Sequence, residues 1–343
     1  MIEHTFAEIH NVRQKRTFKI VVMLSLILAV IFLISLNTGT MRLTPEQVWA
    51  VLTGEGSQKQ QTVLFRLRLP RMIIAILVGA GLAVSGAVLQ GISKNALADP
   101  GILGINSGAN LVVLLIVITA PASIFANPFL LPAGALLGSC CTAAIIFAMS
   151  YKKGRGLHPS RMLLIGIAVA AALSAISAIL TLKLNPMEYD MVYEFSLGSL
   201  YGGDWDFVLS LLPWILGVLP FVIYKSHILN ILHLNESAGV SLGYSVEKER
   251  FYLLLAALAL AASSSAIGGG IGFVGLMGPH MARKLVGPKH QFMLPAAALL
   301  GAILVIAGDT VARSILKNTE LPAGVVISML GAPYFLYLLL KSR

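Results

Sequence analysis

Ten apolar segments recur along this chain of 343 residues, and each is close to the roughly 20 residues that an α-helix needs to cross a bilayer. Their expected bounds are 18–36, 72–91, 97–119, 129–150, 161–182, 207–224, 251–267, 270–286, 293–311 and 322–340. The segments follow one another too closely to leave room for a separate soluble unit. The sequence therefore predicts an all-α, polytopic membrane protein in which residues 1–343 form a single transmembrane domain.

Composition and charge support this class. Hydrophobic residues make up 57% of the chain and charged residues 12%, so a water-soluble globule would expose too much apolar surface. Most of the 25 Lys and Arg residues fall in segments that are cytoplasmic if the N-terminus is inside. Because the number of helices is even, the positive-inside rule places both termini in the cytoplasm, with a tail at 1–17. The net charge of +10 mostly reflects this bias, and we expect no nucleic-acid partner.

Two outer segments are expected to hold short structured pieces. In the segment 37–69, Thr44 can cap a surface helix that starts at Pro45, and Gln47 completes the cap. The segment 183–206 is too polar to span a membrane and too apolar for a plain loop. We expect it to form short re-entrant pieces that line a cavity.

The longest inner loop covers residues 225–250. Asn235 can cap a short helix that begins at the next residue, and small side chains follow, so a partner surface could come close. An ordinary solvated loop is the alternative, and the residues alone do not separate the two.

No pattern that would indicate catalysis or nucleotide binding stands in the sequence context that such a site requires. The stretch 270–275 fits G-x-G-x-x-G, but no βαβ pattern surrounds it, and packing glycines in a membrane helix explain it. No G-x-x-x-x-G-K-[ST] occurs, so any ATP that drives this chain is bound by another subunit. Cys140 and Cys141 are adjacent and lack metal-ligand spacing. We expect a protein that is not an enzyme, with no catalytic residue, bound metal or cofactor.

Arginines crowd the outer start of the second apolar segment, against the positive-inside trend. Arg66, Arg68 and Arg71 lie there, and they are costly unless an acidic partner docks or lipid headgroups contact them. Asp309 and Arg313 are four residues apart near another outer helix end, so they share a face and can pair. No Asp or Glu lies near the centre of any expected helix, which argues against a proton-coupled carrier.

Six motifs together resemble those of the iron-siderophore and cobalamin ABC-importer permeases. They are RLPR at 68–71, GAGLAVSGAVLQ at 79–90, NALADPGILGINSGA at 95–109, GFVGLMGPHMAR at 272–283, DTVAR at 309–313 and ELPAGVVISMLGAP at 320–333. The likeness runs nearly end to end and in order. It implies the type II ABC-importer permease fold with ten helices per subunit, in a bacterial cytoplasmic membrane.

The resemblance also implies partners and a cargo. A second permease subunit, either a copy of this chain or a paralogue, would complete the path through the lipid membrane. Two cytoplasmic ATPase subunits would bind ATP, and an extracytoplasmic binding protein would deliver a ferric siderophore. Cobalamin or haem is the alternative cargo within the family. A carrier coupled to ions or protons is the alternative outside it.

Matching motif positions give expected roles to three groups of residues. Arg68, Arg71 and Arg313 would meet acidic residues of the binding protein. The second group, in loop 225–250, would dock on an ATPase: Asn235, Glu236, Ser237, Ala238, Gly239, Leu242 and Gly243. The third group would narrow the inner end of the path: Asn95, Leu97, Pro159 and Ser160. The chain reads Asn-Ala-Leu-Ala at 95–98, where the family usually reads N-P-L-A, and Asn235 stands where the family usually has Gly.

Overall fold

The computed structural model of the chain describes residues 2–39, 43–101, 103–121, 127–152, 156–157, 159–200, 203–234, 241, 243–316 and 320–341. Its helices are α1 (Ile2–Asn37), α2 (Pro45–Leu52), α3 (Gln58–Gln61), the π-helical η1 (Thr62–Arg68), α4 (Leu69–Ser93), α5 (Ile105–Thr119), α6 (Leu130–Ser150), α7 (Pro159–Thr181), α8 (Pro186–Leu197), α9 (Trp205–Tyr224), α10 (Ser226–Leu234), α12 (Val246–Gly268), α13 (Val274–Val286), α14 (His290–Ile315) and α15 (Ala323–Lys341). Two short strands, β1 (Tyr151–Lys152) and β2 (Gly156–Leu157), pair antiparallel.

The helices have the length and composition of a membrane bundle. Within the described ranges, seven helical stretches are long and apolar enough to cross a bilayer, and α5 and α15 are shorter apolar helices. One stretch runs without interruption from α3 through η1 to the end of α4. The prediction of an all-α polytopic membrane protein is confirmed.

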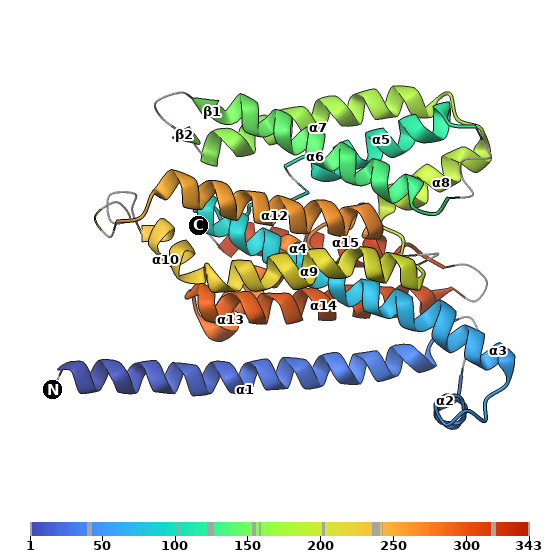
Figure 1. Ribbon diagram of the computed structural model, residues 1–343, viewed down its shortest axis with the longest axis horizontal. Coiled ribbons are helices and arrows are strands. Elements are labelled where there is room, and N and C mark those ends of the chain that lie inside the picture. The colour runs from blue at the N-terminus through green and yellow to red at the C-terminus, as the bar shows by residue number, and fades with distance from the viewer. Residues whose placement is uncertain are drawn as a thin grey trace.

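Helix α4 forms the centre of the larger layer and packs against α12, α13 and α14 (Figure 1). Its core side chains, such as Met72 and Val78, are fully buried. Gly79 lies against Gly301 of α14 so closely that a methyl group on Gly79 would come 2.2 Å from the Gly301 carbonyl oxygen. Glycine is therefore required here, and it allows two backbones to pack without intervening side chains.

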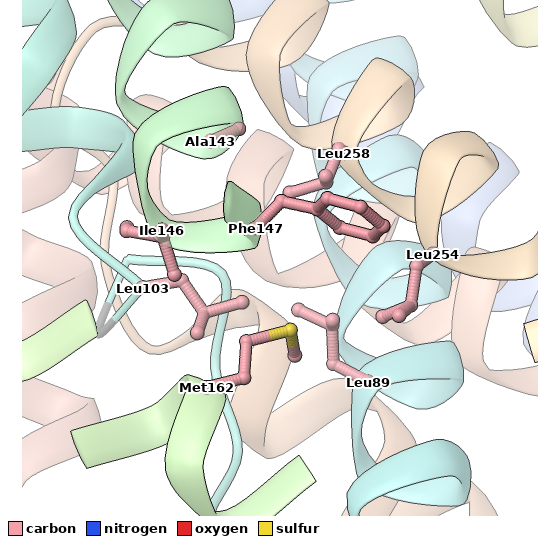
Figure 2. A pocket seen from close by; sticks show the side chains of 8 residues that line it. All are labelled: Leu89, Leu103, Ala143, Ile146, Phe147, Met162, Leu254 and Leu258. Atoms are coloured by element: carbon pink, nitrogen blue, oxygen red, sulfur yellow. The ribbon is translucent and has the colours of Figure 1, made fainter. Parts of the chain in front are cut away.

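Helices α5, α6, α7 and α8 form a second layer beside the first, together with the β1–β2 hairpin (Figure 1). Figure 2 shows one place where the layers meet: Phe147 of α6 reaches toward α12, close to Leu89 of α4 and Met162 of α7. The apolar cavity between these side chains has a volume of only about 10 Å³. Such a cavity offers water no polar partner, so apolar packing holds the layers together here.

Both ends of the chain lie at the same end of the bundle. Helix α1 begins and α15 ends there, near α10 and the β1–β2 hairpin, and α2 and α3 lie at the opposite end (Figure 1). We call these the α10 end and the α2 end. The arrangement agrees with the prediction that both termini share one side of the membrane.

The expected helix over 97–119 is wrong in its first third. Lys94 adopts a left-handed backbone (φ 52°) at the end of α4, and α5 begins only at Ile105. Between them, the Gly101 N–H donates to an oxygen of Asp99 over 2.8 Å, which closes a turn. Much of this segment is buried by protein, and irregular backbone is tolerated at membrane depth only under such cover.

The expected helix over 270–286 is also shorter than predicted. Positive φ angles at Gly269 and Phe273 mark a break, after which α13 begins at Val274. Its 13 residues reach about 20 Å, less than the roughly 30 Å of a bilayer core. The segment 183–206 contains α8, a 12-residue helix that is too short to span, as expected of a re-entrant piece.

Two connecting segments have more structure than plain loops. The predicted cap at Thr44 is confirmed: its hydroxyl accepts from the Gln47 N–H, and the Gln47 side chain accepts from the Thr44 N–H. The segment 225–250, predicted as an inner loop with a short helix after Asn235, contains α10 before Asn235 and the first turn of α12, whereas the predicted short helix lies outside the described residues. The reason is an apolar face on α10, where Ile228 and Leu229 are buried in the bundle.

Candidate functional site

A cluster of buried charges lies at the α2 end, where α4 begins and α14 ends. The Arg71 guanidinium donates from Nε to Asp309 Oδ1 over 2.9 Å, and its Nη2 lies 2.8 Å from the same oxygen. Its Nη1 donates to Glu320 Oε2. Asp309 is fully buried, whereas the Glu320 side chain is 24% exposed. Arg71 is therefore held from two sides by carboxylates that are distant in the sequence.

The other two arginines complete this cluster. Arg313 Nε lies 2.9 Å from Asp309 Oδ2, which confirms the predicted pair, and Arg313 Nη2 donates to Ser35 of α1 over 2.7 Å. Arg68 Nη1 donates to the carbonyl oxygen of Leu36. Thus α1, η1, α4 and α14 are joined through three guanidinium groups.

These contacts change how the three arginines must be understood. They are 4–7% exposed in the chain itself, although the sequence predicted an internal partner for Arg313 alone and a binding-protein or lipid contact for Arg68 and Arg71. Arg66 is exposed on η1. Sequence reasoning missed Glu320, because no local spacing relates it to Arg71.

A polar cavity of about 170 Å³ opens between α5, α7, α8 and the break before α13. Ser107 and Ser174 face each other across it with their hydroxyl oxygens 3.3 Å apart. Asn110 Oδ1 and Ser177 Oγ are buried and make no hydrogen bond within the described part of the chain. Other polar lining residues are Asn106 and Ser196.

The sequence predicted only that the segment 183–206, which contains α8, would line a cavity, and it assigned no residue of α5 or α7 to one. The signal was present in the helical spacing. Asn106 and Asn110 are four residues apart on α5, and Ser174 and Ser177 are three apart on α7, so each pair shares a face. The cavity can hold a polar ligand, because the Asn110 amide oxygen can accept a hydrogen bond and the Ser177 hydroxyl can donate one.

The expected inner-constriction residues lie on two segments near the α10 end. Asn95 follows α4, where its side chain accepts from the Leu97 N–H over 2.9 Å; both residues are half-buried. Pro159 and Ser160 are the first residues of α7 rather than part of the preceding loop. Met162 of α7 and Leu89 of α4 line the same small cavity, so the two segments lie at the same end (Figure 2).

The expected coupling residues lie mostly outside the described residues: Asn235, Glu236, Ser237, Ala238, Gly239 and Leu242. Gly243 is described; it is exposed and has a positive φ of 81°. An ion pair joins the two ends of the segment 225–250, because Lys225 Nζ lies 2.8 Å from Glu249 Oε1. His290 also donates its backbone N–H to Asn230 of α10 over 2.9 Å, which ties α10 to α14.

Among the described residues, no three His, Cys, Asp or Glu side chains come together in a way that could hold a metal. Cys140 and Cys141 are free thiols on α6.

The comparisons with known proteins decide the family. The model of the FecCD transport family matches residues 27–341. The chain belongs to the FecCD transport family. It is thus a permease subunit of an ABC importer, a non-catalytic component, and the ion-coupled carrier considered above is set aside.

Individual relatives cover nearly the whole chain. The iron(3+)-hydroxamate import system permease protein FhuG of Bacillus subtilis is 44% identical over 93% of this chain and 95% of its own length. The hemin transport system permease protein HmuU of Yersinia pestis is 36% identical over 93% of this chain and 95% of its own length. A solved chain described as a metal-chelate type ABC transporter in an inward-facing conformation matches with a TM-score of 0.83 and 32% identity, over 94% of this chain and 99% of that one.

Proposed function

We propose that this permease subunit carries a ferric siderophore across the bacterial cytoplasmic membrane. The observation that carries the proposal is the 44% identity, over nearly the full length, to a permease named for ferric hydroxamate import. Other relatives are named for iron uptake and for Fe(3+)-citrate import. Haem is the second candidate cargo, because a relative named for hemin transport is 36% identical.

The polar cavity between α5 and α7 supports a chelate as cargo. A ferric siderophore presents many oxygen atoms on its surface, and the Ser177 hydroxyl can donate to such an oxygen, whereas the Asn110 amide oxygen can accept from a donor of the ligand; neither atom has a partner within the described part of the chain. Such atoms are costly to leave unpaired, and a passing polar ligand can satisfy them. We assign these two residues a transient contact with the cargo.

The proposed assembly has a second permease subunit, two ATPase subunits that bind ATP, and an extracytoplasmic binding protein. This chain binds no cofactor of its own. We place the α10 end and both termini in the cytoplasm, because most basic residues of the connecting segments lie on that side under the positive-inside rule.

Binding-protein docking is assigned to the α2 end, at Arg68, Arg71 and Arg313. Glu320 is the partly exposed carboxylate that a partner carboxylate would replace at Arg71. ATPase coupling is assigned to the segment from Asn235 to Gly243, whose base the Lys225–Glu249 pair holds. Asn95 and Leu97, with the start of α7, would narrow the inner end of the path.

Uptake by a deletion strain tests the cargo. Deletion of this permease should abolish uptake of at least one iron-55-labelled siderophore, and the wild-type chain should restore it only when its ATPase is active. Restoration by Ser177→Ala, which keeps the space but removes the hydroxyl, should be partial. Unchanged uptake of a full siderophore panel together with loss of haem or cobalamin uptake would overturn the assignment.

A further inference from the structure

A large groove opens along the side of the bundle between α6, α9 and α12. Its volume is about 820 Å³, within the roughly 300–1,000 Å³ typical of small-molecule sites. The lining is apolar and comes from one face of each helix, for example Cys140 and Phe147 on α6 and Trp214 and Val218 on α9. Gly217 faces open space: a methyl group there would meet no atom within 4 Å.

The groove has a floor of core side chains. Phe147, Leu254 and Leu258 line both the groove and the small cavity between the layers, so they separate the groove from the interior (Figure 2). A ligand in the groove would contact the joint between the two layers without entering the path lined by α5 and α7.

The length and position of the groove fit one leaflet of a bilayer. On α12 the lining extends from Phe251 to Ala262, which is about 16 Å of helix and half of a hydrocarbon core of roughly 30 Å. At the α10 end, the aromatic rings of Phe147 and Phe251 bound the groove, and their centroids lie 5.4 Å apart. The groove is thus open to the acyl chains of the leaflet at the α10 end.

A basic residue next to the groove at the α10 end suits the headgroup of a lipid. Lys248 is exposed and lies one turn before Tyr252, on the same face of α12 that continues into the groove. Tyr252 is 52% exposed and lines the groove. An ammonium group and an aromatic ring at this depth are the groups that contact phospholipid headgroups.

We propose that the groove between α6, α9 and α12 is a binding site for an anionic phospholipid of the leaflet at the α10 end. One acyl chain lies along Gly217 and the facing small residues of α6, and the headgroup phosphate lies at Lys248. The lipid supports the joint between the two layers.

Lipid retention by the purified transporter complex tests the site. The probes are phosphatidylglycerol and phosphatidylcholine with identical acyl chains, added to delipidated complex and counted by native mass spectrometry. Gly217→Trp should fill the groove and reduce bound phosphatidylglycerol several-fold, whereas Leu216→Trp, at an adjacent exposed position outside the groove lining, should leave it unchanged. Lys248→Gln should weaken phosphatidylglycerol binding about fivefold, the loss expected for one basic side chain near a membrane surface, and leave phosphatidylcholine unaffected.

A second pair of variants guards against misfolding. Cys140→Trp fills the same groove from α6, and Cys141→Trp is its matched control outside the groove lining. Equal retention by both Trp-filled variants and wild type would overturn the site, and equal binding of the two lipids by wild type would overturn its anionic preference. Disulfide formation between Cys140 residues of two copies in native membranes would show that a second copy occupies the groove, and would also reject the proposal. These readouts do not depend on the cargo, so they remain decisive if the proposed siderophore is wrong.

Discussion

At the scale of single residues, the buried charges at the α2 end dominate the chemistry of the chain. Asp309 is shared by Arg71 and Arg313, and it is fully buried. Removing one partner from a buried ion pair leaves an uncompensated charge, which costs more than the pair contributes in place. The aspartate is therefore the residue on which the cluster depends most.

Asp309→Asn should destabilise the folded chain by about 3–5 kcal/mol, because two buried guanidinium groups lose their shared carboxylate. Glu320→Gln should cost about 1 kcal/mol or less, since the Glu320 side chain is 24% exposed and water screens the loss. Denaturant unfolding of the detergent-solubilised chain would compare the two variants. Equal losses of stability would mean that burial does not set the strength of these pairs.

Glu320→Gln should also tighten docking of the proposed binding protein about fivefold at low salt, because an internal competitor for Arg71 is removed and the local charge becomes more positive. The gain should shrink at high salt, since screening weakens charge attraction. Glu55→Gln, at an exposed carboxylate of the segment between α2 and α3, is the matched control. Docking that weakens in Glu320→Gln at low salt would place the partner elsewhere.

At the scale of elements, hydropathy predicts a helix well where the segment spans lipid and poorly where protein covers it. The bounds of α6, α7 and α9 agree with the sequence to within two residues. The segment 97–119 is apolar on average, yet its first third turns on Asp99 and Gly101. A high hydropathy shows only that a segment is compatible with apolar surroundings. The interior of the bundle provides such surroundings for a turn as well as for a helix.

The contacts of the buried charge cluster were also only partly predictable from the sequence. Spacing of four residues on one helix gave the Asp309–Arg313 pair, because helix geometry is local. The contacts of Arg71 with residues 238 and 249 positions away follow from the packing of α4 beside α14 and beside the segment between α14 and α15, which no local pattern encodes. Hence the family motifs identified the arginines and helical spacing gave the partner of Arg313, whereas the structure supplied the partners of Arg68 and Arg71.

The segment between α10 and α12, which the Lys225–Glu249 pair holds at both ends, supports a prediction for coupling to the ATPase. Gly239→Trp should uncouple ATP hydrolysis from transport or release the ATPase, because a large ring blocks close approach of a partner surface. Thermal stability of the permease should be unchanged. Glu55→Trp, at an exposed position of the α2 end, is the control. Normal complex recovery and transport in Gly239→Trp would reject the assigned coupling segment.

At the scale of the whole molecule, the common location of both termini at the α10 end gives a direct test of orientation (Figure 1). A fluorescent protein that matures only in the cytoplasm should fluoresce when fused after Arg343. The same reporter inserted after Glu55 at the α2 end should stay dark. A dark C-terminal fusion with a bright insertion would invert the proposed topology.

The contact between Gly79 and Gly301 restricts how this molecule can change shape. Two backbones that touch without side chains between them cannot slide or rotate against each other without a clash or the loss of the contact. A transport cycle that preserves this contact must treat α4 and α14 as one rigid body. Shape change would then fall on the connections between α4 and α5 and between α8 and α9, through which the second layer joins the first. The centre of the bundle would serve as the fixed frame, and the layer of α5 to α8 as the moving part.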